Sequence, residues 1–175
     1  TINSGCIFAF DASAARTTSI SGNLNASAGT IDMSSGSRTH ALYLSGATND
    51  LGTLTTAAVA SNIYFNRSGD QTIFGSSNYR NVSFSGSGNK NIQGDLSIGG
   101  TLTVTTVALV FGSSARTISV SGNLSGTGTI NMSNATHTLN LGGATNAITN
   151  LTTDANASTI NYNANGSQQV MSKNN

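Results

Sequence analysis

The sequence contains no proline, no tryptophan and no glutamate, and only 7% of its residues are charged. An ordinary soluble domain is roughly 25% charged and about 5% proline. Long solvent-exposed helices are excluded in practice, because the residues that favour them are scarce. Generic disorder also fits poorly, since disordered chains are usually rich in proline and charge, whereas this one is 37% hydrophobic and contains many Ile, Val and Thr. These absences indicate extended structure.

Basic residues, apolar runs and cysteines are equally sparse. The net charge is +1 and the seven Lys and Arg are spread singly, which leaves no basic stripe for nucleic acid. The longest apolar run, 107–111, is far shorter than the roughly 20 residues of a membrane helix. The single cysteine, Cys6, has no internal disulfide partner, and its apolar neighbours favour a small buried or incidental residue. A first residue Thr1 in place of Met favours a processed or excised piece.

The chain does contain short segments typical of β-strands, separated by residues typical of turns. It has 26 Ser, 24 Thr, 22 Asn and 20 Gly, together more than half of all positions. Apolar, polar, apolar triplets recur between clusters of these residues, and each triplet places two side chains on one face of a strand and one on the other. The triplets are Ile31/Met33, Leu42/Leu44, Ile63/Phe65, Val82/Phe84, Leu96/Ile98, Leu102/Val104, Ile118/Val120, Ile130/Met132, Leu139/Leu141 and Ile160/Tyr162.

The chain also repeats itself. Residues 16–24 match 116–124 at an offset of 100, and residues 39–49 match 136–146 at an offset of 97. We therefore interpret residues 1–175 as one continuous repeat array, with copies at about 10–109 and 110–175 and the second copy incomplete. Triplets about ten residues apart predict a unit of five coils with two strands each, or three to four coils with three.

Two architectures can use this pattern. The one we favour is a parallel β-solenoid, an all-β fold in which each coil stacks on the previous one and apolar residues form interior columns. The alternative is a pair of tandem immunoglobulin-like β-sandwiches, because the unit has the size of such a domain. A narrow core, no large aromatic cluster and no proline-bearing linker favour the solenoid.

Two stretches, 65–73 and 78–104, carry a resemblance. The second contains Asn78-Tyr79-Arg80-Asn81-Val82-Ser83-Phe84-Ser85-Gly86-Ser87-Gly88-Asn89-Lys90. These stretches resemble the repeats of very large bacterial surface proteins, notably those of Bacteroidetes. The resemblance implies an exported, extracellular or cell-surface protein with an adhesin-like or structural role. It carries over no catalytic residue.

Candidate catalytic or metal-binding residues are few. The gaps between Asp11, Asp32, Asp50 and Asp70 are 21, 18 and 20 residues, so coils of about 20 residues would stack them along one edge, where a column of carboxylates could hold a cation such as Ca²⁺. In the second copy Asn131, Ala147 and Ser167 stand opposite the last three of these. We therefore interpret the aspartates as surface carboxylates, and expect no catalytic residue, no metal and no cofactor.

Histidine and arginine recur at matched places in the two copies. His40 and His137 each follow a threonine and precede a triplet, without Cys, Glu or a second His nearby. We interpret them as turn-edge histidines bonded to backbone groups, and Arg16 and Arg116 as residues that cover a corner or bond a carbonyl.

The function that these observations favour is a non-enzymatic structural or adhesive stalk at the cell surface. Its expected partner is itself, head to tail in filaments or by continuation in a longer chain, with surface glycans as a further class and no nucleic acid. The second hypothesis is a carbohydrate-binding or carbohydrate-cleaving β-helix. The third is an ice-binding solenoid, because segments such as 101–106 alternate outward threonines around an apolar residue.

Overall fold

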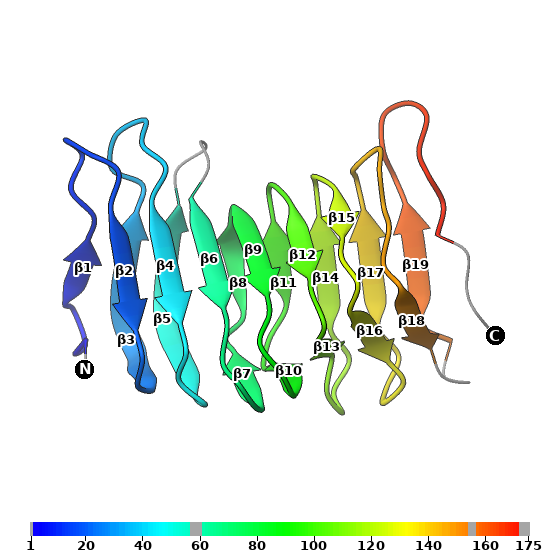
Figure 1. Cartoon of the computed structure of the whole chain (residues 1–175), viewed down its shortest axis with the longest axis horizontal. Helices are drawn as coiled ribbons and strands as arrows, with labels where there is room; N and C mark the ends of the chain where they lie inside the picture. Colours follow the sequence, from blue (N-terminus) through cyan, green and yellow to red (C-terminus); the bar gives the residue numbers. More distant parts are fainter. Residues whose placement is uncertain (1, 57–60, 154–156, 172–175) are drawn as a thin grey trace.

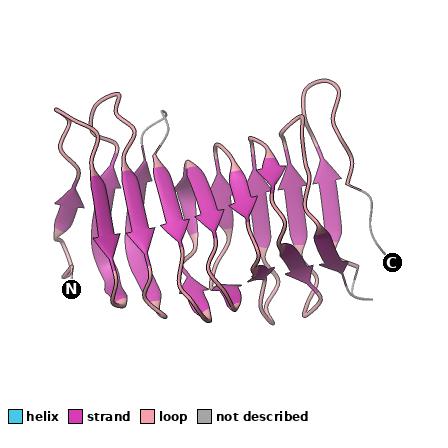
Figure 2. Ribbon diagram, in the orientation of Figure 1, coloured by secondary structure: helices cyan, strands magenta, loops and turns pink. Residues whose placement is uncertain are grey.

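Short parallel strands wind into a β-solenoid of about seven turns in the computed structural model of the chain (Figure 1). The structure describes residues 2–56, 61–153 and 157–171. Within these ranges strands and loops account for the whole fold (Figure 2), and no helix is long and apolar enough to cross a membrane. Every strand pair is parallel, as the solenoid prediction requires, and the alternative of tandem sandwiches with antiparallel sheets is wrong.

The strands form four sheets, three of which are the faces of the solenoid, and from β6 onward each full turn contributes one strand to each of these three faces. The first face contains β2 (Thr17–Ile20), β4 (Ala41–Leu44), β6 (Asn62–Phe65), β9 (Asn81–Phe84), β12 (Leu102–Val104) and β15 (Leu124–Ser125). The second contains β7 (Gln71–Ile73), β10 (Asn89–Ile92), β13 (Ala108–Val110), β16 (Thr129–Met132) and β18 (Asn150–Thr153). The third contains β8 (Ser76–Tyr79), β11 (Leu96–Ile98), β14 (Thr117–Val120), β17 (Thr138–Leu141) and β19 (Thr159–Tyr162).

The N-terminal turns are wider. There β1 (Ile7–Ala9), β3 (Leu24–Met33) and β5 (Asn49–Thr56) form one sheet in place of two. The long strand β5 continues both later faces, because Asn49 N–H donates to Thr72 Oγ1 of β7 at 2.9 Å and Thr56 Oγ1 donates to the Asn78 carbonyl of β8 at 2.6 Å. Cys6, just before β1, is exposed and not buried.

The predicted inward triplets form the core. All of them are buried except Ile160 and Tyr162 of the last strand, which are partly buried against it. On the first face the register partners Thr18, Leu42, Ile63, Val82, Leu102 and Leu124 lie 24, 21, 19, 20 and 22 residues apart along the chain. A turn therefore holds three strands, and the strands follow one another more closely than the predicted ten residues because their corners are only a few residues long.

The sequence repeat is not a whole number of turns. Strand β2 lies on the first face, whereas its sequence match β14 lies on the third. The pairs β4 and β17, and β6 and β19, differ in the same way. From β2 the chain completes four turns through β4, β6, β9 and β12 and then adds β13 and β14, so the unit spans four and two-thirds turns. Matched strands of the two copies therefore lie on different faces. The sequence predicted five coils of two strands or three to four coils of three for the unit, and the three-stranded turn is correct but the number of turns is larger.

Candidate functional surfaces

Matched polar side chains fill the corners of both copies. The set consists of His40 and His137, Asn49 and Asn146, Ser61 and Ser158, and Gln71 and Gln168. The Nδ1 atom of His40 accepts the Arg16 backbone N–H at 3.2 Å, and Nδ1 of His137 accepts the Arg116 N–H at 3.1 Å. This bond agrees with the prediction of backbone-bonded histidines. In each copy, the backbone N–H of the recurring arginine is the group that the histidine accepts.

Two matched glutamine amides bond backbone groups at the next corner. Nε2 of Gln71 donates to the carbonyls of Leu44 at 2.8 Å and Gly46 at 3.0 Å. In the second copy Nε2 of Gln168 donates to Leu141 at 2.7 Å and Gly143 at 2.9 Å. A buried carbonyl without a partner costs about 1–3 kcal/mol, so these amides stabilise the bends of the chain. The repeated polar residues are part of the architecture.

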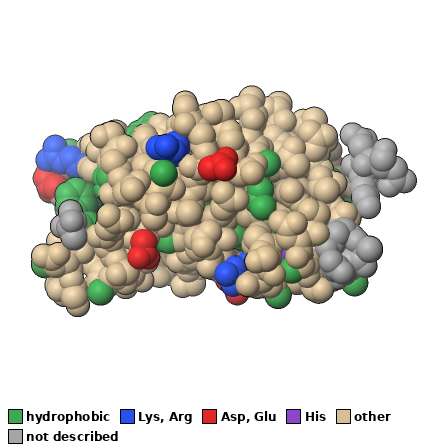
Figure 3. All heavy atoms as spheres, turned by 90° about the horizontal axis from the view of Figure 1, so that it is seen from below, with side chains coloured by type: hydrophobic (Ala, Val, Ile, Leu, Met, Phe, Trp, Pro, Cys, Tyr) green, Lys and Arg blue, Asp and Glu red, His purple; other side chains and the backbone are tan. Residues whose placement is uncertain are grey.

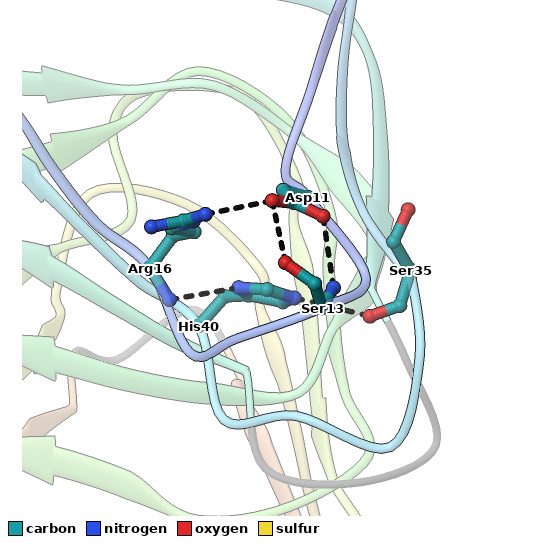
Figure 4. Close-up of polar contacts among 5 residues, drawn as sticks. All are labelled: Asp11, Ser13, Arg16, Ser35 and His40. Atoms are coloured by element: carbon teal, nitrogen blue, oxygen red, sulfur yellow. Dashed lines mark hydrogen bonds and ion pairs between the residues drawn. The ribbon is translucent and has the colours of Figure 1, made fainter.

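One corner gathers an acid, a hydroxyl and an imidazole (Figure 4). The Ser13 hydroxyl donates to Asp11 Oδ2 at 2.7 Å, and Arg16 Nη2 lies 2.7 Å from the same oxygen. The Ser13 backbone N–H, then the Arg16 side chain, hold the pKa of Asp11 well below its usual range. His40 donates from Nε2 to the Ser35 carbonyl at 3.1 Å, since its Nδ1 accepts a backbone N–H. Both ring nitrogens are used by backbone groups, so this His40 contacts no hydroxyl that it could activate.

The aspartates of the predicted cation column do not line up. Asp32 pairs in register with Thr55, and Asp50 with Asn25, so these two acids stand at different places within their turns. Asp70 lies in the corner before β7, where its Oδ1 accepts the backbone N–H of residue 89 at 2.8 Å. The column fails because register partners in the β1–β3–β5 sheet lie 23 to 25 residues apart along the chain, whereas the acids are separated by 18 to 21. Among the described residues no group of three or more His, Cys, Asp or Glu could hold a metal ion, and Asp154 lies outside them.

The outward columns differ from face to face, and one column of the third face carries threonine in three successive turns, at Thr117, Thr138 and Thr159. The other columns are mixed. The first face carries Ser19, Tyr43, Tyr64, Ser83, Thr103 and Ser125. The second carries Thr72, Asn91, Val110, Asn131 and Thr152. The third carries Ser97, Ser119, Asn140 and Asn161. In the segments expected to form a flat ice-binding surface, Thr103 has Ser83 and Ser125 as its register partners and Thr152 has Asn131, so these threonines have no threonine beside them in their columns.

Two tyrosines interrupt the otherwise small outward side chains of the first face. The rings of Tyr43 and Tyr64 stack with centroids 4.4 Å apart and planes inclined by 9°. Burial, followed by the proximity of Tyr43, raises the pKa of Tyr64. Beyond Tyr64, a hollow of about 170 Å³ opens over Ser83 and Thr103. The prediction from single triplets missed this pair, although a spacing of 21 residues between two tyrosines of equal phase is the sequence signal for it.

Among the described residues, no further strand pairs with the outer edge of the terminal strands at either end of the solenoid. Strands β1 and β2 are the outermost strands of their sheets at the N-terminal end, and β18 and β19 are outermost at the C-terminal end (Figure 1). Ile7 is 66% exposed and Phe8 is 40% exposed. A hollow of about 240 Å³ beside them is lined largely by apolar side chains, among them Ile20 and Leu24.

Comparison of the chain with known protein families, curated protein sequences and solved structures gave no match.

Proposed function

We propose that this chain is a non-enzymatic structural or adhesive segment of an exported bacterial surface protein, and that its solenoid extends by end-to-end association. The resemblance of residues 65–73 and 78–104 to repeats of large bacterial surface proteins supports the location. The sparse charge supports a passive surface, since only 7% of the residues are charged and few Lys, Arg and Asp side chains stand among the uncharged groups of the face in Figure 3. Both ring nitrogens of His40 bond backbone groups, and Asp32 and Asp50 are not register partners. These two observations support a role other than catalysis.

The observation that carries the proposal is that, within the described residues, the terminal strands at each end have an outer edge with no strand paired to it. A strand edge exposes backbone N–H and C=O groups that can pair with another chain, and natural proteins usually blunt such edges. Here the first turn adds exposed Ile7 and Phe8 beside its edge, and the last turn leaves Leu151, Ile160 and Tyr162 partly buried at the ends of the interior columns. Stacking the first turn of one molecule on the last turn of another would continue both the sheets and the core.

The contact between such ends is heterologous. The surface at the N-terminal end differs from the surface at the C-terminal end, so one contact leaves two further ends available, and association produces filaments. Because every turn inside the molecule already stacks on its neighbours at the ordinary strand spacing of about 4.8 Å, the junction needs no new architecture.

Sedimentation velocity over a concentration series tests this function. The unaltered chain should form species of increasing length, visible by electron microscopy as rods one solenoid wide. Ile7→Lys places a charge at the N-terminal edge and should weaken association at least about tenfold, because a charge buried in the junction is costly. Asn91→Lys, on the outward column of the second face, is the matched control and should associate normally.

A chain that stays monomeric at the highest concentration reached would overturn the proposal. So would association that Ile7→Lys and Asn91→Lys weaken equally, because the contact would then not involve the ends.

A further inference from the structure

We propose that the hollow beside Tyr64 is a binding site for one uncharged sugar ring, which stacks on the face of the tyrosine that Tyr43 leaves uncovered. The inference goes beyond end-to-end association and does not depend on it. It rests on the order of side chains along the first face, on the polar groups around the hollow and on the comparison with the second copy.

The position of the hollow follows from the strand register. Tyr43 pairs with Tyr64, Tyr64 with Ser83, and Ser83 with Thr103, all on the outward column of the first face. Tyr43 covers one face of the Tyr64 ring at a centroid distance of 4.4 Å. The small side chains of Ser83 and Thr103 leave space on the other side, so Tyr64 forms one wall of the 170 Å³ hollow.

The spacing suits a stacked ring. Neighbouring strands lie about 4.7–4.9 Å apart, and this spacing sets the distance between stacked side chains in an outward column. A ring that lies over Ser83 occupies the next place in the column and meets Tyr64 as Tyr64 meets Tyr43. The volume is well below the roughly 300–1,000 Å³ of pockets for larger ligands, so the hollow fits one ring and leaves the rest of a chain in solvent.

The polar groups select a hydroxylated, uncharged ligand. No charged side chain lines the hollow. The Asn81 amide uses its oxygen for the Thr101 N–H at 3.0 Å and one N–H for Asn62 Oδ1 at 3.1 Å, which leaves a second N–H to donate. The Ser83 hydroxyl supplies another donor and acceptor. A pyranose combines an apolar C–H face for the tyrosine with hydroxyls for these groups, whereas a phosphate or carboxylate would meet no cation.

The second copy shows that the fold does not need the tyrosines. The residues matched to Tyr43 and Tyr64 are Asn140 and Asn161, on the outward column of the third face. There Asn161 Nδ2 donates to Asn140 Oδ1 at 2.8 Å, so an amide ladder takes the place of the stacked rings on equivalent strands. The aromatic pair is therefore a feature of this site and not of the strands that carry it.

The test is titration of the isotope-labelled chain with methyl glycosides of glucose, galactose, mannose and N-acetylglucosamine, followed by backbone amide NMR. At least one should shift the amides of Tyr64, Ser83 and Thr103, with a dissociation constant on the order of 1 mM for so small a ligand. Methyl glucuronide, which carries a carboxylate, should bind at least about tenfold more weakly than its neutral counterpart.

Three variants locate the site. Tyr64→Asn copies the second copy and should weaken binding by about tenfold or more, whereas Tyr64→Phe keeps the ring and should bind within about twofold. Ser83→Tyr continues the tyrosine column, fills the hollow and should abolish the shifts. It serves as an independent test if Tyr64→Asn fails to fold.

The proposal is overturned if none of the neutral glycosides shifts these amides, if the glucuronide binds as well as they do, or if binding persists in Ser83→Tyr. Failure of these titrations would leave the sedimentation result unchanged, because the hollow lies in the middle turns and not at an end.

Discussion

At the scale of single residues, the interior is distinguished by a lysine. Lys90 is fully buried, and its Nζ donates to the carbonyls of Arg67 at 2.8 Å, Ser87 at 3.0 Å and Gly69 at 3.1 Å. Burial, and then the charge of Arg67, lower its pKa from 10.5 to about 8, while Asp70 opposes the shift. Its register partner one turn earlier is Gln71, whose amide serves two carbonyls in the same way. The lysine thus supplies hydrogen bonds to three backbone carbonyls of a corner, and this requires the burial of its charge.

This lysine should make stability rise with pH above about 8. Between its folded pKa of about 8 and its unfolded pKa near 10.5, the unfolded chain holds more protons, so the free energy of unfolding increases with pH. We expect a gain of about 1–2 kcal/mol between pH 7.5 and 9.5 in urea denaturation. The measurement stops there because Tyr79, whose pKa is raised by burial, contributes the opposite trend once tyrosines of the unfolded chain ionise near pH 10.

Lys90→Gln is the matched control for that measurement. It places at this corner the side chain that Gln71 supplies one turn earlier, keeps two donors for the three carbonyls and removes the titrating group. Its stability should change little over the same pH range. An equal rise in both chains would mean that Lys90 is not the source.

At the scale of strands and corners, the stacking of turns depends on glycine. Gly46 follows β4, and its carbonyl accepts from the amides of both Asn49 and Gln71. A Cβ atom built on Gly46 would collide with the Gly22 carbonyl of the preceding turn, and one on Gly143 would collide with the carbonyl of Gly122. In both copies, therefore, the backbone of this corner lies in direct contact with the backbone of the same corner in the preceding turn.

Gly46→Ala should destabilise the protein by about 1–3 kcal/mol, because two backbone segments must separate to admit the methyl group. Gly22→Ala is its matched partner, since nothing lies within 4 Å of a Cβ at that position, and it should be neutral or slightly stabilising. Thermal unfolding of the two variants decides the point. Similar melting temperatures would show that the turns do not stack as closely as described.

Local pattern predicts the elements well and their assembly poorly. The phase of each triplet identifies the buried side chains, such as Leu44 against outward Tyr43, because alternation along a strand is a local property. Lateral neighbours depend on the length of a whole turn, which is the total of three strands and three corners. The aspartate column fails for this reason. The burial of Lys90 could not be predicted from the sequence either, since no local pattern shows that three backbone carbonyls surround its amino group.

At the scale of the whole molecule, the mismatch between repeat and turn has a consequence for surface features. Because the unit spans four and two-thirds turns, the corner of His40 and the corner of His137 belong to different edges of the solenoid. Strands of matched sequence lie on the first and on the third face, so these two faces accept the same strand sequences. A feature carried by each successive unit would return to its original face only after three units, or fourteen turns.

The interchangeability of turns leads to a test by deletion. Val82 and Leu102 are register partners, so removing residues 82–101 takes out one full turn and joins residue 81 to a strand that already fits the column of Ile63. Solenoids are stabilised by contacts between neighbouring turns, and the shortened chain should therefore fold, unfold cooperatively and lose only the stability of one turn.

Removing residues 82–91 takes out about half a turn, brings corner residues onto β6 and moves every later strand away from its face. That chain should lose the cooperative transition in circular dichroism. If both deletions unfold the protein, its turns are not independent units, and if both are tolerated, the register of the interior columns does not determine the fold.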